Sequence, residues 1–133
     1  VFLDTNVLVS ALAARGLCAD LLELVLLEHD LVIGRNVIRE LSKALHEKVK
    51  LPAARTTEIV EFVSGEAIQV VNEVSPVEVE VDADDALVLG EALAARAAFL
   101  VTGDAALLAL DTIRTLRITS PRRFWEILHE QER

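Results

Sequence analysis

The first ten residues read Val1-Phe2-Leu3-Asp4-Thr5-Asn6-Val7-Leu8-Val9-Ser10. Three apolar residues run straight into Asp4, and apolar residues then resume at the spacing of a helix. This order predicts a buried strand, an acidic residue at its tip, and then a helix. In an open parallel sheet flanked by helices, ligands bind in the crevice outside the carboxyl ends of the strands. We therefore expect Asp4 to lie at a ligand site.

Length and composition indicate a small globular protein with one domain, expected to span residues 1–133. The chain is 53% hydrophobic and only 4% aromatic, so Leu, Val, Ala and Ile must build its core. A single cysteine, Cys18, and the lack of a long apolar segment predict a cytoplasmic protein without a membrane span. Because the sequence holds no methionine, we also expect residues to be missing before Val1.

The charge balance argues against an ordinary nucleic-acid-binding protein. The chain carries 22 acidic and 13 basic residues, which gives a net charge of -9, whereas affinity for phosphates normally comes from Lys and Arg. This inference fails if several acidic side chains surround a divalent cation, because the ion inverts the local charge. The places of the acidic residues along the chain therefore decide the question.

Strand-like and helix-like segments alternate along the chain, which predicts a parallel sheet covered by helices on both faces. We expect a single three-layer α/β domain with a central, mostly parallel sheet of about five strands. Asn36 is expected to cap a helix and Gly65 to end one, while residues 72–81 fit either an edge segment or a loop. The predicted strands cover residues 1–3, 31–33, 67–71, 99–101 and 116–118, and the predicted helices cover the segment after Asn6, residues 19–28, 37–48, 52–64, 82–98 and 105–110, and the segment after Pro121.

Two of the predicted strands are wholly apolar and are followed within a few residues by an aspartate, Asp4 after the first strand and Asp104 after the fourth. Glu40 and Asp85, each near the start of a predicted helix, add two carboxylates that can reach the same crevice. Carboxylates a few ångströms apart raise one another's pKa, so such a cluster is costly without a cation. Oxygen ligands in this number suit Mg²⁺ or Mn²⁺.

The segments that carry these acids are Leu3-Asp4-Thr5-Asn6, Val37-Ile38-Arg39-Glu40-Leu41, Asp84-Asp85-Ala86-Leu87-Val88-Leu89 and Leu100-Val101-Thr102-Gly103-Asp104. Taken in this order they resemble the PIN domain, and among its members the chain looks most similar to the VapC-like toxins of toxin-antitoxin pairs. Asp82 or Asp84 could take the place of Asp85, which we choose because the residues after it fit the family pattern. The resemblance implies four catalytic and metal-binding acids, Asp4, Glu40, Asp85 and Asp104, and three supporting polar residues, Thr5, Asn6 and Thr102.

The resemblance also implies an activity, namely a metal-dependent endoribonuclease that hydrolyses RNA phosphodiester bonds with Mg²⁺ or Mn²⁺ as its cofactor. A metal ion in such a site holds the phosphate and lowers the pKa of a bound water. The expected partners are an RNA substrate and a small antitoxin protein. A homodimer is expected as well, because the segment at residues 19–27 is apolar on nearly every side.

Basic residues near the acids are candidates for contact with RNA phosphates. Arg35, Arg39 and Lys43 flank Glu40 in the sequence. The same residues would serve equally well for solubility and for pairing along a helix. The segment after Pro121 offers two weaker candidates, Arg122 and Arg123.

Each of the four acids also has an ordinary interpretation, because aspartates commonly cap helices and turns, and a glutamate between basic residues is usually solvated. Their joint order is what favours a site. One alternative is a catalytically inactive PIN-type module that binds RNA or protein. Another is a haloacid-dehalogenase-like phosphohydrolase, but Asn6 stands where such enzymes have a second aspartate, and no lysine occurs between Lys50 and Asp104.

Overall fold

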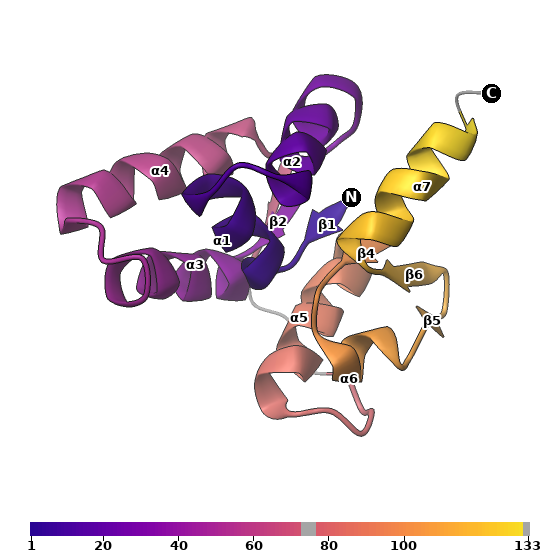
Figure 1. Ribbon diagram of the computed structural model, residues 1–133. Coiled ribbons are helices and arrows are strands. Elements are labelled where there is room, and N and C mark those ends of the chain that lie inside the picture. Colours follow the sequence, from indigo (N-terminus) through magenta and orange to yellow (C-terminus); the bar gives the residue numbers. More distant parts are fainter. Residues whose placement is uncertain (73–76, 132–133) are drawn as a thin grey trace.

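The computed structural model describes residues 1–72 and 77–131. Within these residues six strands form one sheet in the order β3-β2-β1-β4-β6-β5, flanked by seven helices (Figure 1). The predicted α/β fold with a mostly parallel sheet is therefore confirmed. The elements are β1 (Phe2–Leu3), α1 (Thr5–Ala13), α2 (Leu17–Glu28), β2 (Val32–Gly34), α3 (Arg35–Glu47), α4 (Ala53–Glu66), β3 (Gln69–Val71), α5 (Ala83–Ala94), β4 (Phe99–Val101), α6 (Ala105–Leu108), β5 (Thr112–Ile113), β6 (Leu116–Thr119) and α7 (Pro121–Gln131).

Strands β1 and β4 are neighbours at the centre of the sheet and run parallel. Leu3 is in register with Val101, so the two strands end at the same level. The backbone N–H of Asp4 donates to the carbonyl of Val101 at 2.9 Å, which continues the pairing one residue beyond β1. The polar residues that follow both strands therefore leave the sheet at one edge.

The core is built mainly from aliphatic side chains, as the composition predicts. Phe2 and Leu3 of β1 and Leu100 and Val101 of β4 have no exposed surface. Continuous apolar runs of this kind are typical of parallel strands that are covered on both faces. The central strands therefore form a rigid base for the residues at their carboxyl ends.

The strand predictions need two corrections. Strand β5 is absent from them, because a two-residue strand has no alternation that a pattern could reveal; it pairs antiparallel with β6 at the sheet edge. Strand β3 begins at Gln69 rather than at residue 67. Part of the connection at residues 72–81 lies outside the described residues, and residues 77–81 form no strand.

Helix α3 begins at Arg35 rather than at residue 37, so the prediction that Asn36 caps it is wrong. Gly34 occupies the N-cap position and has no side chain to offer. Asn36 lies in the first turn instead, where its backbone N–H donates to the Glu91 carboxylate at 2.8 Å. A cap supplied by a distant helix leaves no local signal in the sequence.

Two helices end elsewhere than predicted. Helix α4 continues through Gly65 to Glu66, so the predicted stop at Gly65 is wrong. Helix α5 ends at Ala94 rather than at residue 98, and Arg96, with a φ of 57°, then turns the chain towards β4. A left-handed residue other than glycine supplies this turn, which is why the sequence does not mark it.

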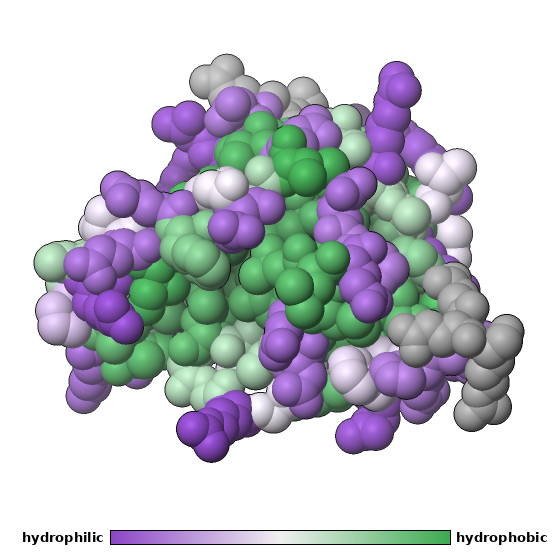
Figure 2. All heavy atoms as spheres, turned by 90° about the horizontal axis from the view of Figure 1, so that it is seen from above, coloured by the Kyte–Doolittle hydropathy of each residue, from purple (hydrophilic) through white to green (hydrophobic). Residues whose placement is uncertain are grey.

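Apolar side chains are also exposed. Helix α2 buries Leu21, Leu22 and Val25, whereas its Leu27 is 75% exposed. Figure 2 shows one face of the molecule where apolar side chains spread over a broad area between polar ones. None of the described helices combines the length and the apolar content that a membrane crossing needs. The homodimer expected from α2 stays a prediction.

Candidate active site

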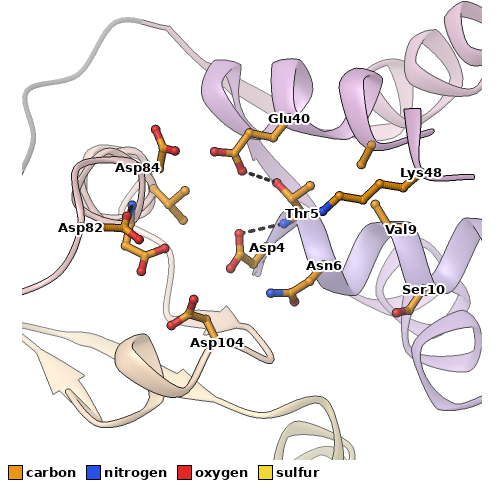
Figure 3. A pocket seen from close by; sticks show the side chains of 13 residues that line it. Asp4, Thr5, Asn6, Val9, Ser10, Glu40, Lys48, Asp82, Asp84 and Asp104 are labelled. Carbon is orange, nitrogen blue, oxygen red and sulfur yellow. Dashed lines mark hydrogen bonds between the residues drawn. The ribbon is translucent and has the colours of Figure 1, made fainter. Parts of the chain in front are cut away.

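A pocket of about 480 Å³ lies at the carboxyl edge of the central strands. Acidic side chains dominate its lining, so we call it the acidic pocket (Figure 3). The four predicted acids come from separate parts of the chain, yet all of them line it. The polar and charged residues of its lining are Asp4, Thr5, Asn6, Ser10, Glu40, Lys48, Asp82, Asp84, Asp85 and Asp104.

Asp4 is the most deeply buried acid of the pocket, at 6% exposure. It caps α1 by accepting a hydrogen bond from the backbone N–H of Thr5 at 2.8 Å. Its other carboxylate oxygen accepts from the Thr102 hydroxyl at 2.7 Å. Burial raises the pKa of Asp4, an effect that these two hydrogen bonds oppose and the charge of Asp104 reinforces. Asp4 therefore serves as a helix cap and still faces the pocket.

Asp104 caps the short helix α6, where one of its carboxylate oxygens accepts from the N–H groups of Ala106 and Leu107. Its own backbone N–H donates to the Thr102 hydroxyl at 3.0 Å. Because Thr102 also donates to Asp4, a single hydroxyl fixes the two aspartates relative to each other. This arrangement gives the predicted supporting role of Thr102 a physical basis.

Asn6 and Thr5 hold further parts of the pocket. The side-chain oxygen of Asn6 accepts from the backbone N–H of Gly103 at 3.1 Å, which ties α1 to the turn before Asp104. The Thr5 hydroxyl donates to Glu40 at 3.0 Å (Figure 3). Both residues therefore hold a neighbouring segment in place.

Glu40 is half-buried, and its side chain points into the acidic pocket (Figure 3). Burial raises its pKa, the hydrogen bond from Thr5 lowers it, and the charges of Asp4, Asp84 and Asp82 raise it further. These charges act on Glu40 because α3 faces the start of α5 across the pocket. Glu40 therefore differs from a fully solvated surface charge, because it is half-buried and faces other acids.

Three aspartates at the start of α5 line the pocket, so lining alone does not separate them. Asp82 is the helix cap and accepts from the backbone N–H of Asp85 at 2.8 Å. The pKa of Asp85 is raised to about 6, first by burial and then by the charges of Asp104, Asp82, Asp4 and Glu40. Asp85 is also less exposed than Asp82 and Asp84, and its choice as the fourth member of the cluster stays a prediction.

The donor set of the pocket consists of carboxylate, amide and hydroxyl oxygens, which are the ligands that Mg²⁺ and Mn²⁺ prefer. As the side chains stand, no group of three or more carboxylate, imidazole or thiol side chains in residues 1–72 and 77–131 is arranged to hold a metal ion. Mg²⁺ keeps several of its waters in protein sites, so it does not require a full cage of side chains. The residues that could hold an ion are Asp4, Glu40, Asp85 and Asp104.

The three basic residues near Glu40 that are candidates for contact with RNA lie outside the lining of the acidic pocket, and their role stays a prediction. Arg35 donates to the side chain of Asn72 at 3.4 Å, and Arg39 lines a separate cavity of about 540 Å³. Lys43 lines that cavity and also a smaller one of about 270 Å³, which it shares with Glu40. None of the three lines the acidic pocket itself.

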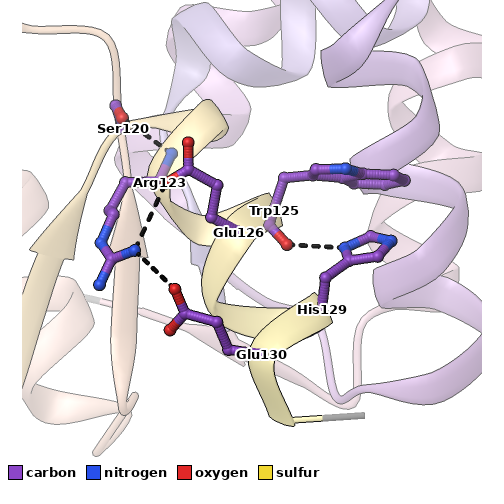
Figure 4. A network of polar contacts seen from close by, with 6 residues as sticks. All are labelled: Ser120, Arg123, Trp125, Glu126, His129 and Glu130. Atoms are coloured by element: carbon purple, nitrogen blue, oxygen red, sulfur yellow. Dashed lines mark hydrogen bonds and ion pairs between the residues drawn. The ribbon is translucent and has the colours of Figure 1, made fainter. Parts of the chain in front are cut away.

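Arg123, one of the two weaker candidates, is engaged in its own helix. Its guanidinium pairs with Glu126 at 3.4 Å and with Glu130 at 3.2 Å (Figure 4). Such exposed pairs contribute little to stability. They nevertheless hold this guanidinium along α7, which lies outside the acidic pocket.

Lys48 is a residue that the sequence reasoning missed. Among the described residues that line the acidic pocket it is the one basic side chain, and Figure 3 shows it extended along the pocket towards Thr5. Glu40, Ala44 and Lys48 line the pocket at a spacing of four residues, which places Glu40 and Ala44 on one face of α3 and Lys48 in line with them at its C-cap. This spacing is the signal that could have identified Lys48.

The fold and the pocket define a class of protein. It is an α/β domain whose central parallel strands lead into clustered carboxylates. The chain belongs to the PIN domain family, because the PIN domain model matches residues 1–106, a range that includes all four acids. The resemblance found in the sequence is thereby confirmed.

Comparison with solved structures agrees on the fold. A chain in the crystal structure of VapBC2 from Rickettsia felis, bound to a DNA fragment from the promoter, superposes with a TM-score of 0.63. The match covers 90% of this chain and 96% of that chain at 14% sequence identity. No curated protein matches the sequence significantly.

Proposed function

We propose that this protein is a metal-dependent endoribonuclease that hydrolyses RNA phosphodiester bonds. The observation that carries the proposal is that Asp4, Glu40, Asp85 and Asp104 line one pocket although the first and last are 100 residues apart in the sequence. Burial and mutual repulsion raise the pKa of Asp85 to about 6, as is expected of carboxylates gathered for a cation. Family membership supports the same conclusion.

Each acid has a proposed part in the reaction. Asp4 and Asp104 would hold Mg²⁺ or Mn²⁺, with Thr102 orienting the first of them. When bound, the ion supplies a Lewis acid for the phosphate and lowers the pKa of a water. Glu40 and Asp85 complete the site, and one of them would accept the proton of the attacking water.

An assay of RNA cleavage with and without divalent metal tests the proposal. Single-stranded RNA should be cut internally when Mn²⁺ is present, and cleavage should stop when the metal is removed with EDTA and return when Mn²⁺ is restored. RNA binding without cleavage under any metal would instead favour the inactive PIN-type module. The haloacid-dehalogenase-like alternative finds no support in the family match.

Lys48 is proposed to contact a phosphate of the RNA beside the metal site. Replacing it with alanine should raise the KM for RNA about two- to fivefold and leave kcat nearly unchanged, because one exposed charge contact is worth up to about 1 kcal/mol. The effect should shrink as salt increases. Lys50→Ala is the matched control, since Lys50 is exposed and does not line the pocket. Equal KM values for the two variants would remove Lys48 from the site.

A toxin role and an antitoxin partner are also proposed. The structural neighbour comes from the VapBC2 complex, and an acidic pocket would accept an antitoxin segment that presents an Arg or Lys to the carboxylates. Such a cation would take the place of the metal. Titration of Mn²⁺ into the complex, which should release the antitoxin, measures this competition.

We also propose that the protein is a homodimer in the cytoplasm. Light scattering would measure the mass of the dimer.

A further inference from the structure

Glu91 of α5 is a buried carboxylate outside the lining of the acidic pocket. It is 2% exposed, and its Oε1 atom has no hydrogen-bond partner among the described residues. Burying a carboxylate is costly unless hydrogen bonds or a cation compensate for the lost water. The contacts of the other carboxylate oxygen, Oε2, must therefore explain why Glu91 is buried.

The Oε2 atom of Glu91 binds the start of α3. It accepts from the backbone N–H of Asn36 at 2.8 Å. Burial raises the pKa of Glu91, and the backbone N–H groups of Asn36 and Val37 lower it. A carboxylate at a helix N-terminus also complements the helix dipole. Glu91 thus does for α3 what an N-cap side chain normally does.

Gly34 makes this cap possible. It stands at the N-cap position of α3 and has no side chain to bond the free N–H groups. A Cβ atom added at Gly34 would overlap the carboxylate carbon and both oxygens of Glu91. A side chain at position 34 would therefore displace the Glu91 carboxylate, and the local cap is replaced by one from another helix.

The cap joins the two helices that carry half of the acidic cluster. Asn36 lies one helical turn before Glu40 on α3, and Glu91 lies six residues after Asp85 on α5. The two helices pack against each other, and each is rigid over such a short span. A hydrogen bond between them at this level therefore constrains the separation of Glu40 and Asp85 across the pocket.

We infer that Glu91 is a positioning residue of the candidate site, which sets the distance between the carboxylates of α3 and α5 by capping α3 from α5. The inference rests on the proposed function, because the distance between these carboxylates matters only if they bind a metal ion together. The cap itself depends only on the contacts of Glu91. Two measurements are therefore needed, one for the cap and one for the site.

The test separates capping from positioning with three variants. Glu91→Ala removes both, and Glu91→Gln keeps an oxygen that can accept from the same N–H groups. The double variant Gly34→Ser/Glu91→Ala returns a local cap to α3 in the space that the carboxylate leaves, but it does not restore the bond to α5. Melting temperature and amide hydrogen exchange at Asn36 and Val37 report the cap, and calorimetric titration with Mn²⁺ reports the site.

Glu91→Ala should lower the melting temperature by about 5 °C, expose both amides to exchange, and weaken Mn²⁺ binding about tenfold or more. The double variant should recover the melting temperature and the amide protection but not the Mn²⁺ affinity, while Glu91→Gln should stay within about threefold of the wild-type affinity. Mn²⁺ affinity that returns with the local cap, or that never falls, would overturn the positioning role. Wild-type protein that binds no Mn²⁺ would overturn the proposed function and the positioning role with it, while leaving the cap.

Discussion

Replacing Asp104 with asparagine should lower RNA cleavage by more than about a hundredfold and weaken Mn²⁺ binding, because the variant loses a proposed metal ligand. A hundredfold is the upper range for removing a residue that only supports a ligand, so a ligand should exceed it. The fold should survive. Asparagine is as good a cap as aspartate, so it can accept the same hydrogen bonds from Ala106 and Leu107 at the start of α6.

Asp4→Asn should behave in the same way, and both variants should melt at a higher temperature than the wild type when no metal is present. The reason is that each removes one charge from a cluster whose members repel one another. Asp20→Asn is the matched control, because Asp20 lies near the start of a helix, as the N-cap residues Asp4 and Asp104 do, but is exposed and outside the pocket. Unchanged cleavage and unchanged calorimetric affinity for Mn²⁺ in both Asp4→Asn and Asp104→Asn would refute the site assignment.

The stability of the protein should respond to pH in opposite directions with and without metal. For the metal-free protein, the pKa of Asp85 is about 6 in the folded state against 3.8 for an ordinary aspartate. The folded state therefore binds more protons between these values, so stability is fully present below about pH 4 and is lost as pH rises through 6. Asp4 and Glu40, whose pKa values are also raised, act in the same direction.

The magnitude of this metal-free effect is on the order of 1 kcal/mol for Asp85, once the shift is discounted for its solvent exposure. Metal should reverse the trend, because it binds the ionised carboxylates. With Mn²⁺ at about 100 times its Kd, the gain in unfolding free energy at pH 7.5 is about 2.7 kcal/mol, and it should disappear by about pH 5. Thermal melts at pH 5 and 7.5, with Mn²⁺ or EDTA, would show the melting temperatures with and without metal agreeing at pH 5 and separating at pH 7.5. Metal-free stability that rises between pH 5 and 7.5 would contradict this prediction.

The sequence by itself indicated the alternation of strands and helices, apart from the short strand β5, and it singled out the four acids. Uniformly apolar strands that run into Asp4 and into Thr102-Gly103-Asp104 carry this information, because burial of a parallel strand leaves only its end polar. The central sheet, the α/β class and the family all follow from such local patterns. The approach of Asp4 and Asp104 at one edge was expected from the same patterns, and it is realised because β1 and β4 run parallel and end in register.

Only the tertiary structure decided which side chains face the pocket. Arg39 and Lys43 lie close to Glu40 along the chain. Glu40 nevertheless lines the acidic pocket, whereas Arg39 lines a separate cavity. Lys48, which the sequence did not single out, lines the pocket. The reason is that the rotation of a helix about its axis is set by packing against other elements and not by the charges along it.

The contacts that complete the site also join residues that are far apart in the chain. Thr102 donates to Asp4 across 98 residues, and Asn36 donates to Glu91 across 55. A pattern read along a sequence covers a helical turn or a strand, so it cannot reveal partners at such separations. The cap of α3 depends on this kind of contact. The sequence pattern placed the cap on Asn36, but the capping carboxylate belongs to Glu91 of another helix.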